Sequence, residues 1–248
     1  MKKLGLLFLL STLVSCNALK AITDGETDLD DKFGAGQYNE ELWNGLVSFW
    51  RFDESGSTQD RSDIQGSNNL IYNQGSINST GGINGNALDC SSIDGTNRFT
   101  LNSSIGLNYG NNGNFSISFW IYLNTFNAGD YIADFSTGYN ITLSGSSDIT
   151  LNVNGNTVSG NVNTGAWTHV TYTVDRVNGS STYINGAQQN FTTHNSTGVS
   201  YIDSTFAVCS STGFAANPDG QIDSFGIWNR TLSSSEISDL YRGFNNLD

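Results

Sequence analysis

The segment Asp219–Tyr241, which reads DGQIDSFGIWNRTLSSSEISDLY, joins an alternating apolar pattern directly to a capped helix. Side chains of a β-strand point alternately to its two faces. Alternation from Ile222 onward therefore predicts that Asp223 and Phe225 share one face of a strand, with Ile222 on the other. A strand with apolar side chains on both faces must pack within a sheet, so the segment limits the chain to folds that contain one.

The helix that follows this strand begins with a complete start signal. Ser233 and Glu236 have the spacing of a capping box, in which each side chain accepts a hydrogen bond from the other residue's backbone N–H. Leu232 and Ile237 stand where a hydrophobic staple places its two apolar contacts. A strand that ends in a stapled helix is typical of the closing segment of a β-domain, and it gives Glu236 a structural role.

Short apolar runs separated by turn residues occupy most of the remaining chain. We expect strands at Leu46–Phe52, Asn69–Tyr72, Ala87–Cys90, Arg98–Leu101, Phe115–Leu123, Tyr131–Phe135, Tyr139–Leu143, Ile149–Val153, Trp167–Val174, Ser181–Ile184, Phe206–Cys209 and Ile222–Trp228. Asn154-Gly155 and Asn185-Gly186 are hairpin-turn pairs, and only 13% of the residues are charged. Together these patterns predict an all-β fold, an antiparallel β-sandwich with a short C-terminal helix.

The N-terminus resembles a bacterial lipoprotein signal. A pair of lysines precedes an apolar run that is too short to cross a bilayer, which needs about 20 apolar residues. The run ends in Leu13–Cys16, which is similar to a lipobox, so we expect residues 1–15 to be removed and Cys16 to carry lipid. The alternative is an ordinary secretory signal in which Cys16 has no role. Asn17 favours the outer membrane or cell surface of the bacterial envelope.

An acidic segment follows the cysteine. Residues 16–43 contain few large apolar side chains and show no sustained period, so we expect a flexible tether before one domain at residues 44–248. The formal net charge of −13 disfavours nucleic acid as a partner, because phosphate backbones are bound by basic surfaces. An acidic surface is compatible with calcium, with glycans or simply with solubility.

Six motifs occur in order along the predicted domain. They are GLVSFWRFDESG at 45–56, GINGNALDC at 82–90, FSISFWIYL at 115–123, AWTHVTYTVD at 166–175, STYINGAQ at 181–188 and GQIDSFGIWNRTLSSSEI at 220–237. In content and order they resemble the laminin-G-like jelly roll of the concanavalin A-like lectin/glucanase superfamily, in its pentraxin-like bacterial version. The resemblance implies the fold more strongly than the activity, because one fold serves many functions.

Enzymes of this superfamily cleave glycans with paired glutamates on one strand, because hydrolysis needs an acid together with a base or nucleophile. After Glu54 the only glutamate in the chain is Glu236, and the capping box already explains it. His169 lies inside a strand motif, where we expect a structural role, and His194 lies in a polar loop. We therefore predict a non-catalytic domain.

Calcium is the one cofactor that the resemblance implies. Many relatives bind it at the rim of the sandwich through acidic residues near the opening and closing strands, since calcium prefers oxygen ligands. Matched by position, Asp53 and Asp223 are the first candidates in this chain, and Asp60 and Asp219 are weaker ones. The alternatives are a loop cap for Asp53 and a structural hydrogen bond for Asp223.

Cys90 and Cys209 are the cysteines left after Cys16, and both lie in strand-like segments. They form either a disulfide or buried free thiols, and spacing alone does not decide between the two. Relatives often have an aromatic or aliphatic residue at the position of Cys90. This departure favours a disulfide between Cys90 and Cys209.

Aromatic residues in the strand motifs are expected to belong to the core, as they do in relatives. These tryptophans are Trp50, Trp120, Trp167 and Trp228. A ligand site would instead lie in loops, with residues 127–131 and 212–219 as walls. Phe126, Tyr131 and Phe214 are the candidate contacts.

These observations predict a lipid-anchored envelope protein whose lectin-like domain binds glycans or surface proteins, as in adhesion. The alternative is a structural or protein-interaction lipoprotein within an envelope assembly. Both interpretations reach the membrane only through the lipid anchor, and neither sets an oligomeric state.

Overall fold

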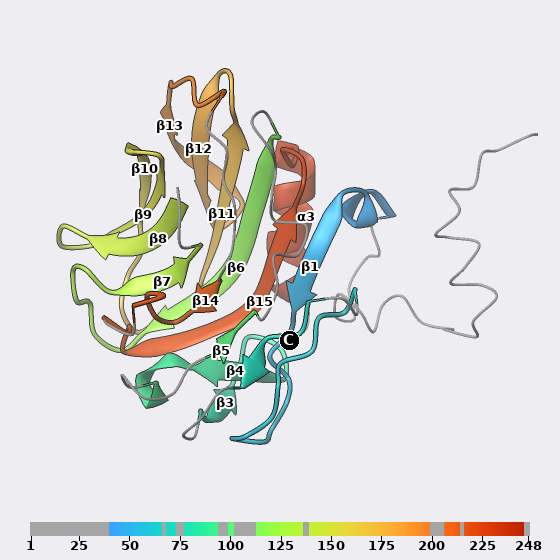
Figure 1. Ribbon diagram of the computed structural model, residues 1–248, viewed down its shortest axis with the longest axis vertical. Coiled ribbons are helices and arrows are strands. Elements are labelled where there is room, and N and C mark those ends of the chain that lie inside the picture. The colour runs from blue at the N-terminus through green and yellow to red at the C-terminus, as the bar shows by residue number, and fades with distance from the viewer. Residues whose placement is uncertain are drawn as a thin grey trace, which may run out of the picture.

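Two antiparallel sheets pack face to face and form the domain (Figure 1). The structure is a computed structural model that describes residues 40–65, 68–72, 77–93, 99–101, 113–135, 139–198, 206–213 and 216–245. One sheet, the helix-covered sheet, contains in spatial order β13 (Ala187–Thr192), β12 (Gly179–Ile184), β11 (Thr168–Asp175), β6 (Phe115–Leu123), β15 (Gly220–Trp228), β4 (Asn86–Asp89) and β3 (Ser79–Gly81), with β1 (Leu46–Trp50) also paired to β15.

The second sheet contains, in spatial order, β10 (Asn156–Asn161), β9 (Asp148–Val153), β8 (Tyr139–Ser144), β7 (Tyr131–Asp134), β14 (Ala207–Val208), β5 (Phe99–Thr100) and β2 (Ile71–Tyr72). The helical segments are η1 (Glu40–Trp43), η2 (Cys90–Ser92) and α3 (Ser234–Asn245). This arrangement confirms the predicted all-β sandwich with a short C-terminal helix. Strands β3, β10 and β13 were not among the predicted ranges, although the turns before β10 and β13 were predicted at Asn154-Gly155 and Asn185-Gly186. Every residue of β13 except its last is exposed, so it lacks the apolar alternation that marks a strand.

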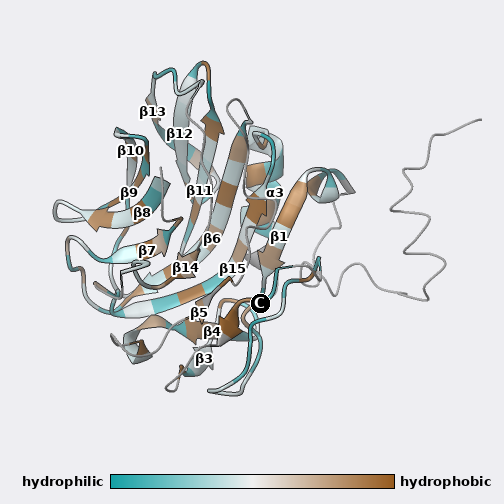
Figure 2. Cartoon of the chain, viewed as in Figure 1, coloured by the Kyte–Doolittle hydropathy of each residue, from teal (hydrophilic) through white to brown (hydrophobic). Residues whose placement is uncertain are grey.

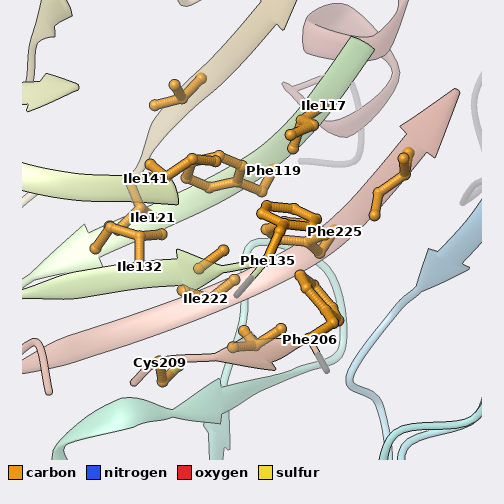
Figure 3. Close-up of a cluster of buried hydrophobic side chains, with 14 of the residues drawn as sticks. Ile117, Phe119, Ile121, Ile132, Phe135, Ile141, Phe206, Cys209, Ile222 and Phe225 are labelled. Carbon is orange, nitrogen blue, oxygen red and sulfur yellow. The ribbon is translucent and has the colours of Figure 1, made fainter. Parts of the chain in front are cut away.

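The main core fills the space between the two sheets. Figure 3 shows aromatic and aliphatic side chains from both sheets converging there, with Phe119 and Phe225 stacked at 5.3 Å between ring centroids. Figure 2 shows how β6 contributes to this core: hydrophobic and less hydrophobic residues alternate along the strand. Burial of one face of each sheet supplies most of the stabilisation, at roughly 25 cal/mol per Å² of apolar surface.

The tryptophans divide between buried and partly exposed positions. Trp50, Trp120 and Trp228 are at most 2% exposed, as predicted. Trp167 is only partly buried and packs at the border of a second, smaller apolar cluster, so the prediction that it belongs to the core is wrong. The reason is its position directly before β11, at the end of a loop whose residues 163–166 are exposed.

A β-bulge in β15 changes the faces predicted for the closing strand. The pairing of β15 with β6 shifts register between Asp223 and Gly226, and Ser224 has a φ of 52°. Ile222 and Phe225 both point into the main core, whereas Asp223 lies opposite Trp120 on the outer side. The prediction that Asp223 and Phe225 share a face is therefore wrong, because the extra residue of a bulge resets the alternation.

A disulfide joins the two sheets through the core. Cys90 follows β4 and Cys209 follows β14; the two residues are bonded, and their Cα atoms lie 5.3 Å apart. Both are fully buried, and the bond confirms the predicted pair. Because 119 residues separate the two cysteines, the bond shortens a long loop of the unfolded chain, which stabilises the fold by about 4–5 kcal/mol in the chain-entropy description.

Arg230 links the N-terminal segment of the described residues to the C-terminal helix α3. Its guanidinium donates to both carboxylate oxygens of Glu236 in α3, and also to the backbone carbonyls of Glu41 and Asn44. The Glu236 carboxylate also accepts from the Ser233 N–H at 2.8 Å, while the Ser233 hydroxyl accepts from the Glu236 N–H, which confirms the capping box. Segment η1 packs on the domain through Leu42, which is 5% exposed, so the described domain includes residues 40–43, which were assigned to the predicted tether.

Helix α3 covers part of the outer face of the helix-covered sheet (Figure 1). Beneath it lies His169, which is 1% exposed and stacks near Trp120 and Tyr241. Its Nε2 shares a 2.9 Å hydrogen bond with the Ser118 hydroxyl, and burial lowers its pKa to about 3. The side chain is therefore a neutral structural residue, in agreement with the role expected for it.

This buried histidine predicts a specific loss of stability in acid. An unfolded histidine takes up a proton near pH 6.5, whereas folded His169 does so only near pH 3, so falling pH favours the unfolded chain between these values. The loss approaches about 1.4 kcal/mol per pH unit. Urea unfolding at a series of pH values should show a steeper acid loss in the wild type than in His169→Gln. Equal slopes in the two proteins would refute this account; His194 is unchanged in both.

Candidate functional site

The two loops predicted as walls of a ligand site lie side by side at one rim of the sandwich. The loop after β6 begins at Asn124, whose N–H donates to the carbonyl of Asp219 at 2.9 Å. The same Asp219 accepts hydrogen bonds from the Asn124 amide at 2.9 Å and the Thr125 hydroxyl at 2.8 Å. Where the loop ends, the Tyr131 N–H donates to the carbonyl of Ala216 at 2.8 Å. These contacts hold residues 124–131 and 216–219 together as one surface, the loop rim.

Asp130 is the unusual member of the loop rim. It is 9% exposed, and its Oδ2 has no hydrogen-bond partner among the residues that the structure describes. Burial raises the pKa of this carboxyl, the nearby Asp219 raises it further, and a hydrogen bond with Asn127 opposes the shift. A buried acceptor without a donor costs stability, so Asp130 is a polar group of the loop rim with an unmet hydrogen bond.

The three aromatic residues predicted as ligand contacts have different surroundings. Phe126 is partly buried and packs against the main core, so one side of its ring is already covered. Tyr131 is partly exposed and lies opposite Thr142 of β8. Phe214 lies outside the described residues. Of the predicted contacts, Phe126 and Tyr131 both lie at the loop rim and are partly exposed.

Neutral polar side chains continue from Tyr131 across the outer face of the second sheet. Thr142 lies opposite Thr150, and Thr150 lies opposite Ser159 on the next strand, with a 2.8 Å hydrogen bond between the last two hydroxyls. The sequence did not single out this face, because hydroxyl and amide residues in alternate positions are also the ordinary outer residues of a sandwich. The face offers donors and acceptors with almost no charge.

Asp53 and Asp223, the first calcium candidates, hold one glycine-containing loop from two sides. The Asp223 carboxylate accepts from the N–H of Ile83 at 2.9 Å, and the Asp53 carboxylate accepts from the N–H of Asn86 at 3.0 Å. A Cβ on Gly85 would collide with the Asp53 carboxylate, so the loop requires glycine there. The structure therefore brings the two residues together, and it also gives both the hydrogen-bonding roles expected as alternatives to metal binding.

The electrostatic environment of Asp53 and Asp223 favours the binding of a cation. Asp223 is fully buried, and burial raises its pKa to about 7, with a further contribution from Asp53. Among the residues that the structure describes, the cation at the pair is Arg51, whose Nε lies 2.9 Å from Asp53 Oδ2. Within the described residues, no group of three or more histidine, cysteine or acidic side chains is placed to hold a metal, so further ligands would have to be backbone or amide oxygens.

The weaker calcium candidates lie apart from this pair. Asp219 is bonded within the loop rim, and because a strand rises about 3.3 Å per residue it stands roughly 13 Å along β15 from Asp223. Asp60 is exposed and lies beside Arg61. Burial lowers the pKa of Arg61, and the charge of Asp60 partly opposes that shift. The four predicted residues therefore do not form one site.

The family and structural relatives agree with this architecture. The laminin G family model described as the concanavalin A-like lectin/glucanases superfamily matches residues 94–238, more than half of the chain. A search of curated proteins finds no matching sequence. Among the described residues, no helix is both long and apolar enough to cross a membrane.

Solved structures with the same fold include binding domains of enzymes and toxins. Domain 4 of AbnA, an extracellular arabinanase from Geobacillus stearothermophilus in complex with arabinotriose, is 20% identical with a TM-score of 0.61, and the match covers 79% of this chain and 98% of that one. The binding domain of Paraclostridial Mosquitocidal Protein 1 is 18% identical with a TM-score of 0.63, covering 82% and 53%. The botulinum neurotoxin serotype G binding domain is 17% identical with a TM-score of 0.62, covering 79% and 50%. This chain thus spans about half the length of the toxin binding domains, and identities this low show a shared fold.

Proposed function

The chain belongs to the concanavalin A-like lectin/glucanase superfamily, and we propose that it is a non-catalytic recognition protein that binds glycans at the loop rim. The observation that carries this proposal is the Asp130 carboxylate, which is buried and has one oxygen without a donor among the described residues. A sugar hydroxyl would satisfy that oxygen once the covering residues of the loop rim moved aside, because the oxygen itself is buried in the free domain, and carboxylates are strong acceptors for such donors. The Asn127 amide hydrogen-bonds with this carboxylate, and the Asn124 amide donates to Asp219 on the same rim.

The neighbouring structures support a polyhydroxylated ligand in general terms. One of them is a domain seen with arabinotriose, and the others are toxin binding domains. The net charge of −13 favours neutral sugars over sulfated or sialylated ones, because anionic ligands would be repelled. Glu236 is held by Ser233 and Arg230, which leaves the described residues without the paired glutamates of a glycosidase.

A surface protein is the second candidate ligand, and the edge strand β13 favours it. Its residues from Ala187 to Phe191 are exposed and uncharged, and Phe191 is 54% exposed. Exposed strand edges can pair with a strand of another protein. The chain would then act as a structural or interaction protein of an envelope assembly.

We further propose that Cys16 carries a lipid that anchors the domain to the bacterial envelope, at the outer membrane or cell surface. The support is the sequence of residues 1–17, which lies outside the described residues. The described domain begins at residue 40, so residues 16–39 would connect it to the lipid. Two or more acyl chains would hold it firmly, because each buried methylene contributes about 0.8 kcal/mol.

We also propose that Asp53 and Asp223 bind calcium together with oxygens of the loop 82–86. A bound calcium would tie the opening strand, this loop and the closing strand together. One support is the buried carboxylate of Asp223, whose pKa is raised by burial and by the neighbouring Asp53. The other is the space beside the two carboxylates, which Gly82 leaves next to Asp223 and Gly85 leaves next to Asp53. Arg51 would have to release Asp53 for the ion to bind.

Glycan binding is tested with a variant that removes the charge of Asp130 and preserves its shape. Asp130→Asn should weaken binding to neutral oligosaccharides by about tenfold or more, because hydrogen bonds to charged groups contribute roughly 1.5–3 kcal/mol. Calorimetric titration measures this effect, and Asp239→Asn on exposed α3 surface is the matched control. A wild type that binds nothing on a broad glycan array would overturn the proposal.

Calcium binding is tested by thermal unfolding in calcium and in chelator. Calcium at a hundredfold excess over Kd should stabilise the wild type by about 2.7 kcal/mol, since the ligand binds only the folded chain. Asp223→Asn should lose this shift, whereas Asp60→Asn, which changes an exposed aspartate, should keep it. The absence of any calcium shift in the wild type, together with no calcium in elemental analysis, would contradict the proposal.

Lipid attachment is tested by metabolic labelling with a palmitate analogue and by membrane fractionation. Cys16→Ala should lose the label and leave the membrane fraction, because the thiol is the attachment point. Asn17→Ser, which alters the neighbouring residue, should keep the label. Unchanged labelling of Cys16→Ala would refute the anchor.

A further inference from the structure

Four side chains form a row across the outer face of the helix-covered sheet. Asp89 of β4 lies opposite Gln221 of β15, and Gln221 lies opposite Tyr122 of β6. Thr168 lies opposite Ile121, so the preceding residue, Trp167, continues the row beside Tyr122. Because neighbouring strands are about 4.8 Å apart, the row is roughly 14 Å long. We call Asp89, Gln221, Tyr122 and Trp167 the aromatic row.

The two aromatic members of the row are held in place but remain accessible. Their ring centroids lie 5.7 Å apart with the planes tilted by 59°. Trp167 packs against the smaller apolar cluster beneath α3, yet both residues are only partly buried. Trp120, two residues before Tyr122 on the same face, is 2% exposed because Tyr241 of the helix stacks on it. The aromatic row therefore begins where the cover provided by α3 ends.

Most polar side-chain atoms of the aromatic row have no hydrogen-bond partner among the described residues. The described residues supply no hydrogen-bond partner for the indole nitrogen of Trp167, the hydroxyl of Tyr122 or the side-chain amide of Gln221. Asp89 uses Oδ1 to accept from Ser91. The row therefore combines two partly exposed rings with donors and acceptors at fixed strand spacing. Ring faces flanked by a few fixed polar groups are the usual composition of a small-molecule site.

The aromatic row is continuous with the loop rim. Tyr122 is followed at once by Leu123 and Asn124, and Gln221 is preceded by Gly220 and Asp219, with Gly220 opposite Leu123. A Cβ on Gly220 would collide with the backbone carbonyl of Tyr122, so glycine is needed for these two strands to approach. A ligand chain bound at the loop rim can therefore continue over the edge of the sheet onto the row.

We propose that the aromatic row is a second part of the glycan site, where a sugar ring stacks on Trp167 and Tyr122 while its hydroxyls bond to Gln221 and Asp89. This inference rests on the proposed glycan binding and specifies the ligand. The apolar face of a pyranose suits an aromatic surface, because both are hydrophobic and flat. The carboxylate of Asp89 and the net charge of −13 select a neutral oligosaccharide that is longer than one sugar.

The experiment measures affinity for arabinotriose, maltotriose and mannotriose by calorimetric titration of the full chain. Trp167→Ala should weaken binding of the preferred sugar by roughly ten- to thirtyfold, as expected for an aromatic residue that supplies a large contact in a binding site. Val177→Ala is the control, because Val177 is 57% exposed in the turn between β11 and β12 and lies outside the row. Gln221→Ala removes one polar contact without touching an apolar cluster, and should weaken binding by about threefold to tenfold.

The outcomes separate this inference from the proposed function. If the wild type binds none of these sugars nor any other on a glycan array, both are overturned. If the wild type binds, Asp130→Asn weakens binding, and Trp167→Ala and Gln221→Ala bind as the wild type does, the aromatic row is overturned and the loop rim stands. Weaker binding by Trp167→Ala and Gln221→Ala, with binding by Val177→Ala unchanged, supports the row. A ligand-induced change in tryptophan emission that disappears in Trp167→Phe gives an independent readout.

Discussion

The antiparallel pairing of β6 with β15 is the constraint on which the rest of the structure depends. Each strand is nine residues long, and their central position in the sheet fixes what lies on each side. One face of the pair supplies Phe119 and Phe225 to the main core, and the other supports α3. The far end of the pair carries the loop rim and the aromatic row, so core, helix and recognition surface share one scaffold.

The bulge at Asp223 and Ser224 shows how this pairing serves the site as well as the core. It returns Phe225 to the core and leaves Asp223 facing the glycine-containing loop on the outer side. A residue with positive φ and a fully buried carboxylate both cost stability, and the surrounding hydrogen bonds must hold them. Strained features of this kind concentrate at functional positions, which agrees with the calcium site proposed there.

Much of the fold could be predicted because its signals are local. The capping box of Ser233 and Glu236, the hairpin at Asn154-Gly155 and the alternation of β6 all depend on residues close in sequence. The candidate site could be predicted only in part. Loops 127–131 and 212–219 do meet, but Asp130 was not singled out, because its burial depends on the packing of segments far apart in sequence. Strand β13 was missed because an exposed edge strand has no apolar period.

By itself, the sequence determined that this chain forms an antiparallel sandwich closed by a capped helix, because turn residues and short-range periodicity encode those elements directly. Only the tertiary structure decided that Cys90 bonds Cys209, that Asp223 and Phe225 face opposite sides, and that Trp167 stays accessible beside Tyr122. Each of these depends on register between strands or on where α3 ends. Register is set by the pairing of distant segments, and one bulge is enough to reverse the face of every residue beyond it.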